Sequence, residues 1–405
     1  MQIDSLPDYQ YWNENLIGND FGTTRKNRYV TFDVDQGGLN NIRLVFEYVA
    51  VIAAITRRTL VLPPATPWYL INNTAGGPYK GVTNMADVFE VDALKKALPV
   101  ITTNEFIARA SDHLDIPGQF RQVDFSLEQN KELRESWSSW LLADSESPDW
   151  RPFATLICFP DIKAAQRGPD LSDDYVDRRQ LVEFSHRMMA APVLHFPSNK
   201  TQRSLGPVAT MLASEDATLP RLGRRLLKHH LRYRNEIFEY ADRAVKALMP
   251  GRFNAMHVRR NDFQYKQTRL SAQEIHNNVK SLLDPTLPLY LATDDQSGEL
   301  ARELQKLFGF PQVFQLADTL KQLSGDVPYA WEGTLEKIIC AYADRFVGTD
   351  LSTFSAYIHR LRGYMQKEDQ NCYYHGVNYE DPQSQPPPVT GTVYLRENPI
   401  LWLDC

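Results

Sequence analysis

The sequence predicts an α/β protein built from two domains that face each other across a cleft. Short apolar strands alternate with helices in both halves of the chain, the order expected of parallel sheets covered by helices. Three strand ends carry glycine-rich or polar turns, and open α/β sheets bind their ligands at such ends. With 405 residues the chain is too long for one ordinary core, so two domains are expected.

The composition limits the class of partner. Hydrophobic residues make up 43% of the chain and charged residues 23%, as in soluble globular proteins. A net charge of −6 argues against a nucleic-acid partner or an anionic membrane. The four cysteines are scattered, which predicts neither a zinc site nor a dense disulfide framework. The N-terminus has no signal-peptide pattern and no run of about 18 apolar residues occurs, so we expect no membrane span and, for the chain as written, a cytoplasmic location.

In the N-terminal half, a strand over 29–34 leads through the turn 35–38 into a long helix that begins at Leu39. The apolar positions of this helix step by three and four, the spacing of one buried face: Leu39, Ile42, Phe46, Val49 and Ala53. A strand over 59–62 follows and is stopped by two prolines. A glycine turn at a helix N-terminus inside such a βαβ unit is a common anion site.

The rest of this half is expected to continue the α/β pattern, with an elaboration at about 126–180. The expected elements are helices over 85–98 and from 104, strands over 100–103 and 192–196, and one long helix over 221–248. Pro250-Gly251 ends that helix and is the expected domain boundary. The domains are therefore predicted at 1–250 and 251–380, with a Pro-rich linker and terminal segment at 381–405.

The C-terminal half repeats the strand–helix order more cleanly. A strand ends just before Arg259, and Ser271 with Glu274 forms a capping box that opens the next helix. The remaining expected elements are strands over 287–293, 312–316 and 345–348, helices over 297–308 and 334–343, and a helix after the turn 349–355.

Two arginines at a strand end, Arg259 and Arg260, indicate an anion site. A guanidinium donates two parallel hydrogen bonds to a phosphate, which makes arginine the usual phosphate ligand. A structural Arg–Asp pair that holds a loop is the simpler alternative. Ser352 and Thr353, at another strand end, could hold phosphate at a helix N-terminus or simply cap the helix. Together with Gly37-Gly38 in the first domain, these turns predict a diphosphate held in a cleft.

Four blocks resemble the GDP-fucose protein O-fucosyltransferase family, and its thrombospondin-repeat branch more closely than its EGF-repeat branch. The blocks are 37–43 with 60–64, 257–263, 291–294, and 336–355, in the family's order and spanning roughly residues 29–365. The resemblance implies a GT-B architecture of two Rossmann-like domains, with the acceptor side on the first domain and GDP-sugar binding on the second. It also implies inverting, metal-independent transfer of fucose from GDP-fucose to a hydroxyl of a protein or glycan acceptor, without a cofactor.

The resemblance also implies roles for single residues. Arg259 grips the β-phosphate and stabilises the departing GDP, and Asn40 is its catalytic partner in the first domain. His257 touches the nucleotide, although a core histidine on a strand is the alternative. Glu336 stands where the family has an aspartate that contacts the nucleoside. The full nucleotide-sugar set is Gly37, Gly38, Leu39, Asn40, His257, Arg259, Glu336, Ser352, Thr353 and Phe354.

One departure from the family pattern concerns the base. The thrombospondin-repeat branch has a glutamate before its Gly-(Phe/Leu)-Asn turn, and this chain has Gly37 there, which cannot take a proton. Asp35 and Asp262 are the nearby substitutes. Loss of the base opens two alternatives: a sugar-nucleotide- or glycan-binding pseudoenzyme, or a transferase that uses another acceptor or GDP-sugar. Retention of Arg259 and Ser352-Thr353 favours an active donor site.

Two further points remain open from sequence. Asp33-Val34-Asp35 is a D-x-D pattern, by which metal-dependent glycosyltransferases hold a cation, but its setting of strand and glycine turn is unusual for that role. Asp294-Asp295 is interpreted as a helix N-cap with its neighbour.

Animal members of the family work in the endoplasmic reticulum, which would be the location if a leader had been removed.

Overall fold

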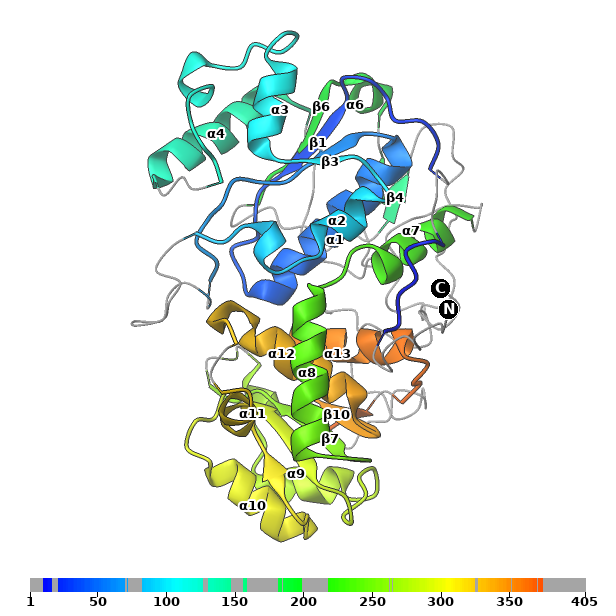
Figure 1. The fold of residues 1–405 in the computed structure, drawn as a ribbon, viewed down its shortest axis with the longest axis vertical. Helices are drawn as coiled ribbons and strands as arrows, with labels where there is room; N and C mark the ends of the chain where they lie inside the picture. Colours follow the sequence, from blue (N-terminus) through cyan, green and yellow to red (C-terminus); the bar gives the residue numbers. More distant parts are fainter. Residues whose placement is uncertain are drawn as a thin grey trace, which may run out of the picture. The chain divides into compact units, whose positions relative to one another are not determined.

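The structure is a computed structural model, and the regions it describes are 10–16, 21–69, 71, 82–126, 130–146, 156–158, 181–183, 185–198, 218–261, 263, 265–324, 327–350, 352–369 and 371–373. Asp262, most of the elaboration at 126–180 and the tail at 381–405 lie outside these residues. The α/β class is confirmed, because the two larger parallel sheets are each accompanied by helices (Figure 1).

The chain divides into two compact units between Arg234 and Asn235, ahead of the expected Pro250-Gly251. We refer to Trp12–Arg234 as the N-terminal unit and to the chain from Asn235, with Tyr11, as the C-terminal unit. The single helix expected over 221–248 is wrong, since α7 (Thr218–His229) and α8 (Asn235–Leu248) are separate helices. Between them, Tyr233 forms an isolated bridge with Phe89.

The N-terminal unit contains a four-stranded parallel sheet in the order β3-β2-β1-β6. Its strands are β1 (Tyr29–Phe32), β2 (Thr59–Val61), β3 (Val100–Ile101) and β6 (Val193–Phe196). The long helix α1 (Leu39–Thr56) joins β1 to β2, as expected. Because β1 lies between β2 and β6, the strand order reverses at β1, and ligands of open α/β sheets bind at such a point.

The other elements of this unit differ in part from expectation. They are η1 (Met85–Asp87), α2 (Val91–Lys95), α3 (Thr103–Ala110), η2 (Gly118–Phe120), α4 (Lys131–Asp144), β4 (Leu156–Cys158), β5 (Leu181–Glu183) and α6 (His186–Ala190). The helix expected over 85–98 is wrong, because the segment forms a 3-10 turn and a short helix. α3 begins earlier than expected, since Thr102 and Glu105 form a capping box there.

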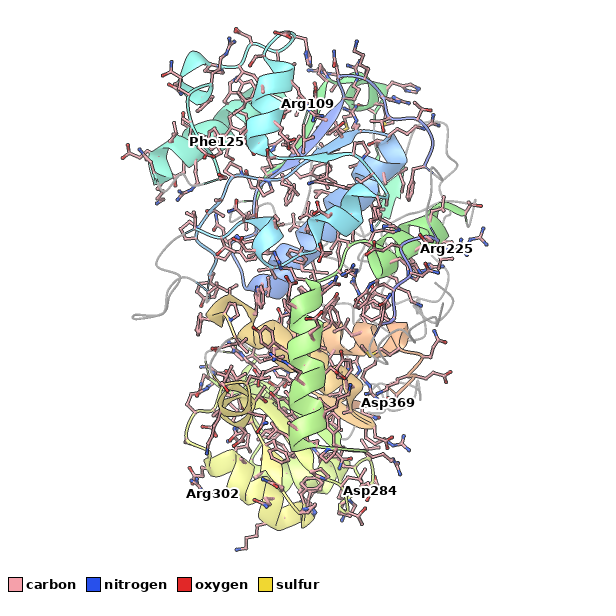
Figure 2. All side chains as sticks on the ribbon, viewed as in Figure 1. Arg109, Phe125, Arg225, Asp284, Arg302 and Asp369 are labelled. Atoms are coloured by element: carbon pink, nitrogen blue, oxygen red, sulfur yellow. The ribbon has the colours of Figure 1, made fainter. Side chains whose placement is uncertain are left out.

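The C-terminal unit contains a five-stranded parallel sheet in the order β11-β10-β7-β8-β9. Its strands are β7 (Asn254–Val258), β8 (Leu289–Thr293), β9 (Val313–Phe314), β10 (Arg345–Gly348) and β11 (Asn371–Cys372). The start of β7 is fixed by Asn254, whose Nδ2 donates to the carbonyl of Asp284 at 2.8 Å (Asp284 is labelled in Figure 2). The order again reverses at the first strand of the unit, so the carboxyl ends of β7 and β10 are the predicted ligand position.

Side chains alternate across this sheet as strand geometry requires. Met256, Val258, Leu289, Leu291 and Val347 join a core with α9 (Ala272–Val279) and α10 (Glu299–Phe308). The residues between them face the other side, where α12 (Glu332–Tyr342) contacts β7 and β8. His257 therefore points toward the side of the sheet that carries α12.

The remaining helices and turns of the C-terminal unit are η4 (Lys266–Thr268), α11 (Leu316–Gln322), η5 (Tyr329–Trp331) and α13 (Thr353–Tyr364). The capping box of Ser271 and Glu274 is confirmed at the start of α9. The strand expected over 312–316 is shorter than predicted, because Leu316 already begins α11.

Helix α1 is the central core helix of the N-terminal unit. Its length and apolar composition would suit a membrane span, but 83% of it is buried inside the protein. It also buries an ion pair: Arg43 Nη1 lies 2.5 Å from Glu47 Oε1, and each side chain is only 1% exposed. Two charges this deep are stable only while both are present.

We predict that Glu47→Gln destabilises the protein by about 3–5 kcal/mol, because it removes the charged carboxylate that pairs with the buried Arg43 guanidinium. The matched control is Glu135→Gln, which breaks the exposed pair of Lys131 and Glu135 at the same helical spacing. Exposed pairs contribute about 0–1 kcal/mol, so this variant should unfold almost like the wild type. Urea unfolding followed by circular dichroism compares the two, and equal midpoints would contradict the prediction.

Candidate functional site

Arg259 follows directly after β7 and is held by the end of β8. Its Nη1 lies 3.0 Å from Asp294 Oδ2, and the side chain stays 32% exposed. Asp294 also accepts hydrogen bonds from the backbone N–H groups of Arg260 at 2.7 Å and Asn261 at 3.1 Å. Within the described part of the chain, no other group is bonded to this guanidinium, so its remaining N–H groups can receive a phosphate.

His257 lies on β7, two residues before Arg259, and packs against the start of α13. Its Nδ1 is 2.7 Å from Ser355 Oγ, and its ring stacks on Phe354 with centroids 4.4 Å apart. Burial, together with the positive charge of Arg259, lowers the pKa of His257 to about 3. The imidazole is therefore neutral at physiological pH.

Thr349 connects the ends of β10 and β7. Its backbone N–H donates to Ser355 Oγ at 2.8 Å, and its hydroxyl donates to the carbonyl of His257 at 2.8 Å. The same hydroxyl accepts from the backbone N–H of Arg259 at 3.0 Å. One threonine thus fixes the backbone on both sides of the strand end that carries His257 and Arg259.

Ser352, Thr353 and Phe354 lie at the N-terminus of α13. Ser352 is the N-cap residue by position, but its side chain makes no capping hydrogen bond, and the first turn contains no acidic residue. The simple capping interpretation therefore does not account for this serine. An uncapped helix N-terminus with a hydroxyl beside it is suited to an anion.

Glu336 lies on α12, and its carboxyl group interacts with Tyr290 of β8. Burial, with a smaller contribution from Glu332, raises the pKa of Glu336 to about 8. The next residue, Lys337, lies on the Phe354 side of the helix, with its Nζ 5.6 Å from the centre of that ring. Glu336 is thus placed beside Tyr290, and Lys337 beside the aromatic residue of the α13 turn.

In the N-terminal unit, the turn 35–38 leads into α1. The N–H of Gly37 donates to Asp35 Oδ1 at 2.7 Å, which closes the turn, and Gly38 is the N-cap of α1. No side chain caps α1. Its first turn, which includes Leu39 and Asn40, has no acidic residue, so this helix N-terminus also suits an anion. Asp35 is only 3% exposed and orders the turn; its role as a base stays a prediction.

The aspartates of the alternative interpretations have structural partners. Asp33 Oδ2 accepts from Ser138 Oγ at 2.8 Å and lies 3.7 Å from His195 Nε2. Burial acts to raise the pKa of Asp33, but His195 and Ser138 outweigh it and keep that pKa below its usual value. In the described regions, no three His, Cys, Asp or Glu side chains gather as a metal would require.

The N-cap interpretation of Asp294-Asp295 is wrong, because Gly298 is the N-cap of α10. Asp294 instead binds Arg259, a role that the sequence did not reveal. Thr349 and Ser355 were missed as well. Both lie in the block 336–355 that carries the family resemblance, close to the predicted Ser352-Thr353-Phe354 turn, but neither was given a role in the site.

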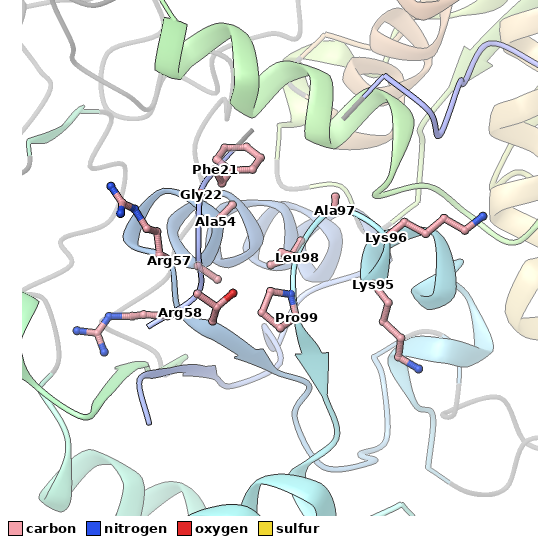
Figure 3. A pocket seen from close by; sticks show the side chains of 12 residues that line it. Phe21, Gly22, Ala54, Arg57, Arg58, Lys95, Lys96, Ala97, Leu98 and Pro99 are labelled. Carbon is pink, nitrogen blue, oxygen red and sulfur yellow. The ribbon is translucent and has the colours of Figure 1, made fainter. Parts of the chain in front are cut away.

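A cavity of about 260 Å³ lies elsewhere in the N-terminal unit (Figure 3). Its lining includes Ala54, Leu98 and Pro99, with Arg57 and Arg58 on one side and Lys95 and Lys96 on the other. It lies at the C-terminal end of α1, about 23 Å along the helix from Gly38 at 1.5 Å per residue. It is therefore separate from the turn that carries the predicted residues.

Comparison with known proteins identifies a related family. The model of the family described as GDP-fucose protein O-fucosyltransferase matches residues 29–365. No curated protein sequence gives a match.

Solved fucosyltransferase structures match most of this chain at low sequence identity. A crystal structure of POFUT1 in complex with GDP-fucose is 17% identical, with a TM-score of 0.43 over 87% of this chain and 98% of that chain. A structure of the fucosyltransferase NodZ from Bradyrhizobium is 15% identical, with a TM-score of 0.40 over 84% of this chain and 94% of that chain.

We predict that Gly348→Ala destabilises the protein by about 1–3 kcal/mol, the usual cost of overpacking. A Cβ at position 348 would lie 2.8 Å from both Cβ and Oγ of Ser355, so the start of α13 would have to shift. The matched control is Gly333→Ala in α12, whose Cβ would meet Phe354 Cε2 at an ordinary 3.8 Å. That change should stabilise α12 by about 0.5–1 kcal/mol. Thermal unfolding measures both, and equal melting temperatures would refute the packing argument.

Proposed function

This chain belongs to the GDP-fucose protein O-fucosyltransferase family, and from that premise we propose that it transfers fucose from GDP-fucose to a hydroxyl of a protein or glycan acceptor. We further propose that the reaction inverts the anomeric carbon and needs no metal ion. Family membership makes the chain a glycosyltransferase. The observation that carries the finer proposal is Arg259, fixed by Asp294 at the strand-order reversal and still 32% exposed.

A fixed guanidinium supplies what the leaving group requires. As the bond between fucose and GDP breaks, negative charge develops on the β-phosphate. A preorganised cation stabilises this charge without reorganising during the reaction. In metal-dependent transferases a divalent cation takes this role, so a rigid arginine in its place supports metal-independent transfer.

Three other groups support diphosphate binding in the C-terminal unit. The N-terminus of α13 offers backbone N–H groups, and Ser352 adds a hydroxyl that does not cap the helix. His257 lies against Phe354 of the same turn. In the N-terminal unit, the N-terminus of α1 after Gly37-Gly38 is uncapped and, like that of α13, carries the partial positive charge of a helix dipole.

Transfer also requires that the proton of the acceptor hydroxyl be removed. A general base typically contributes about 10²–10⁴-fold, and the glycine at position 37 cannot provide one. Asp35 is tied to the N–H of Gly37. We therefore propose that transfer depends chiefly on stabilisation of the departing GDP. The competing function, a nucleotide-sugar-binding protein without transfer, is favoured only by the glycine at position 37.

Titration calorimetry with GDP tests the donor site. We expect binding that is the same with Mg²⁺ and with a chelator. Arg259→Ala should lose about 2 kcal/mol, the value of a hydrogen bond to a charged group. Arg259→Lys should fall between the two, because it keeps the charge and loses the two-pronged hydrogen bond.

The outcomes separate the candidate functions. No GDP binding, or binding only with Mg²⁺, would overturn the metal-free donor site. If GDP binds as expected, release of fucose from GDP-fucose identifies a transferase donor site, whereas stable GDP-fucose identifies the binding protein.

A further inference from the structure

The proton positions in the His257–Ser355 contact follow from the neighbouring groups. Ser355 is 2% exposed, and its hydroxyl carries a single proton. Its oxygen already accepts a hydrogen bond from the N–H of Thr349 at 2.8 Å. The proton of the hydroxyl must therefore go to an acceptor, and His257 Nδ1 at 2.7 Å is the only one bonded to it in the described part of the chain.

The opposite assignment is unfavourable. If Nδ1 of His257 carried the proton, the Ser355 oxygen would accept twice and its own O–H would point at no acceptor. A buried donor left without a partner costs the free energy of its desolvation. Nδ1 is therefore the acceptor and, because the imidazole is neutral, the ring proton is on Nε2.

We propose that Ser355 is a positioning residue that fixes His257 in its Nε2–H form, so that this N–H donates a hydrogen bond to an oxygen of the bound donor nucleotide. This inference rests on the proposed function, from which the contact between His257 and the nucleotide is taken; the new assignment is the role of Ser355. Nε2 has no hydrogen-bond partner among the residues that the structure describes, and stacking on Phe354 fixes the plane of the ring.

A neutral donor has a physical advantage at this position. Arg259 supplies the positive charge two residues away, and a second cation on buried His257 would be repelled by it and disfavoured by burial. The Nε2–H form gives a directed hydrogen bond without a second charge. Arg259 then stabilises charge on the leaving group, and His257 orients the nucleotide.

The connection through Thr349 extends the role of Ser355. The threonine whose N–H binds Ser355 also binds the carbonyl of His257 and the N–H of Arg259 through its hydroxyl. A displaced Ser355 would thus disturb both groups that face the nucleotide. We therefore assign Ser355 to the positioning of the site, without contact to the substrate.

The first test measures the tautomer directly in the ligand-free, full-length protein. Histidine-selective ¹⁵N labelling with long-range ¹⁵N–¹H correlation shows which ring nitrogen carries the proton, and the spectrum of His257→Gln identifies the resonances of His257. We expect a proton on Nε2 only. A proton on Nδ1, or a doubly protonated ring at neutral pH, would overturn the inference whether or not GDP binds.

Two serine variants test what causes the tautomer. Ser355→Ala removes the hydroxyl, so the Nδ1–H form should become populated. Ser352→Ala removes a hydroxyl three residues earlier that does not contact His257, and it should leave the ring spectrum unchanged. An unchanged ring spectrum in Ser355→Ala would show that Ser355 does not set the tautomer.

The second test separates the two ring nitrogens by substitution. The amide of glutamine reaches about as far as Nε2, and the amide of asparagine only about as far as Nδ1. We expect His257→Gln to bind GDP nearly as the wild type does and His257→Asn to bind about tenfold more weakly, equivalent to about 1.4 kcal/mol. Wild-type affinity in His257→Asn, or equal loss in both variants, would overturn the donor role of Nε2. Lack of GDP binding by the wild type would instead overturn the proposed function.

Discussion

The close approach of α13 to the end of β10 is the constraint on which the site depends. A side chain at position 348 would collide with Ser355 at 2.8 Å, so only glycine allows the first turn of α13 to lie there. This approach lets a single hydroxyl, that of Ser355, contact both Thr349 and His257. The glycine is thus required for packing, since its backbone conformation is one that other residues adopt. The polar network of the site follows from this contact.

The network separates charge from hydrogen bonding. Asp294 orients Arg259 through one contact and leaves the guanidinium partly exposed, so the cation is held in place and can still bind a ligand. His257 is buried and neutral, and the first turn of α13 carries no acidic residue. A diphosphate bound at this end of the C-terminal unit would therefore meet the cation of Arg259 and several neutral donors.

The sequence predicted the elements whose signals are local and missed those set by distant contacts. Apolar periodicity located α1, a short apolar run located β7, and the capping box located α9. The single helix expected over 221–248 and the helix expected over 85–98 failed together, because the two segments pair with each other. The N–H of Glu90 binds the carbonyl of Arg232, and the N–H of Arg234 binds the carbonyl of Val88. No glycine or proline marks either break, so a local pattern could not reveal it. Asp294 was misassigned for a related reason. It lies beside Arg259 because β7 and β8 are neighbours and Val258 pairs with Thr293, and the sequence of a strand does not show which strand it will pair with.

The two units contribute unequally to the proposed chemistry. In the C-terminal unit, Arg259 faces outward with donors to spare, as stabilisation of a leaving group requires. In the N-terminal unit, both aspartates before the glycine turn already have partners, Asp33 with Ser138 and Asp35 with Gly37. Using Asp33 as a base would disturb the contacts at the end of β1, and using Asp35 would disturb the turn that precedes α1. The residue at position 37 is a glycine and cannot act as a base. The balance of groups therefore favours a reaction led by departure of GDP, with removal of the acceptor proton following as the new bond forms.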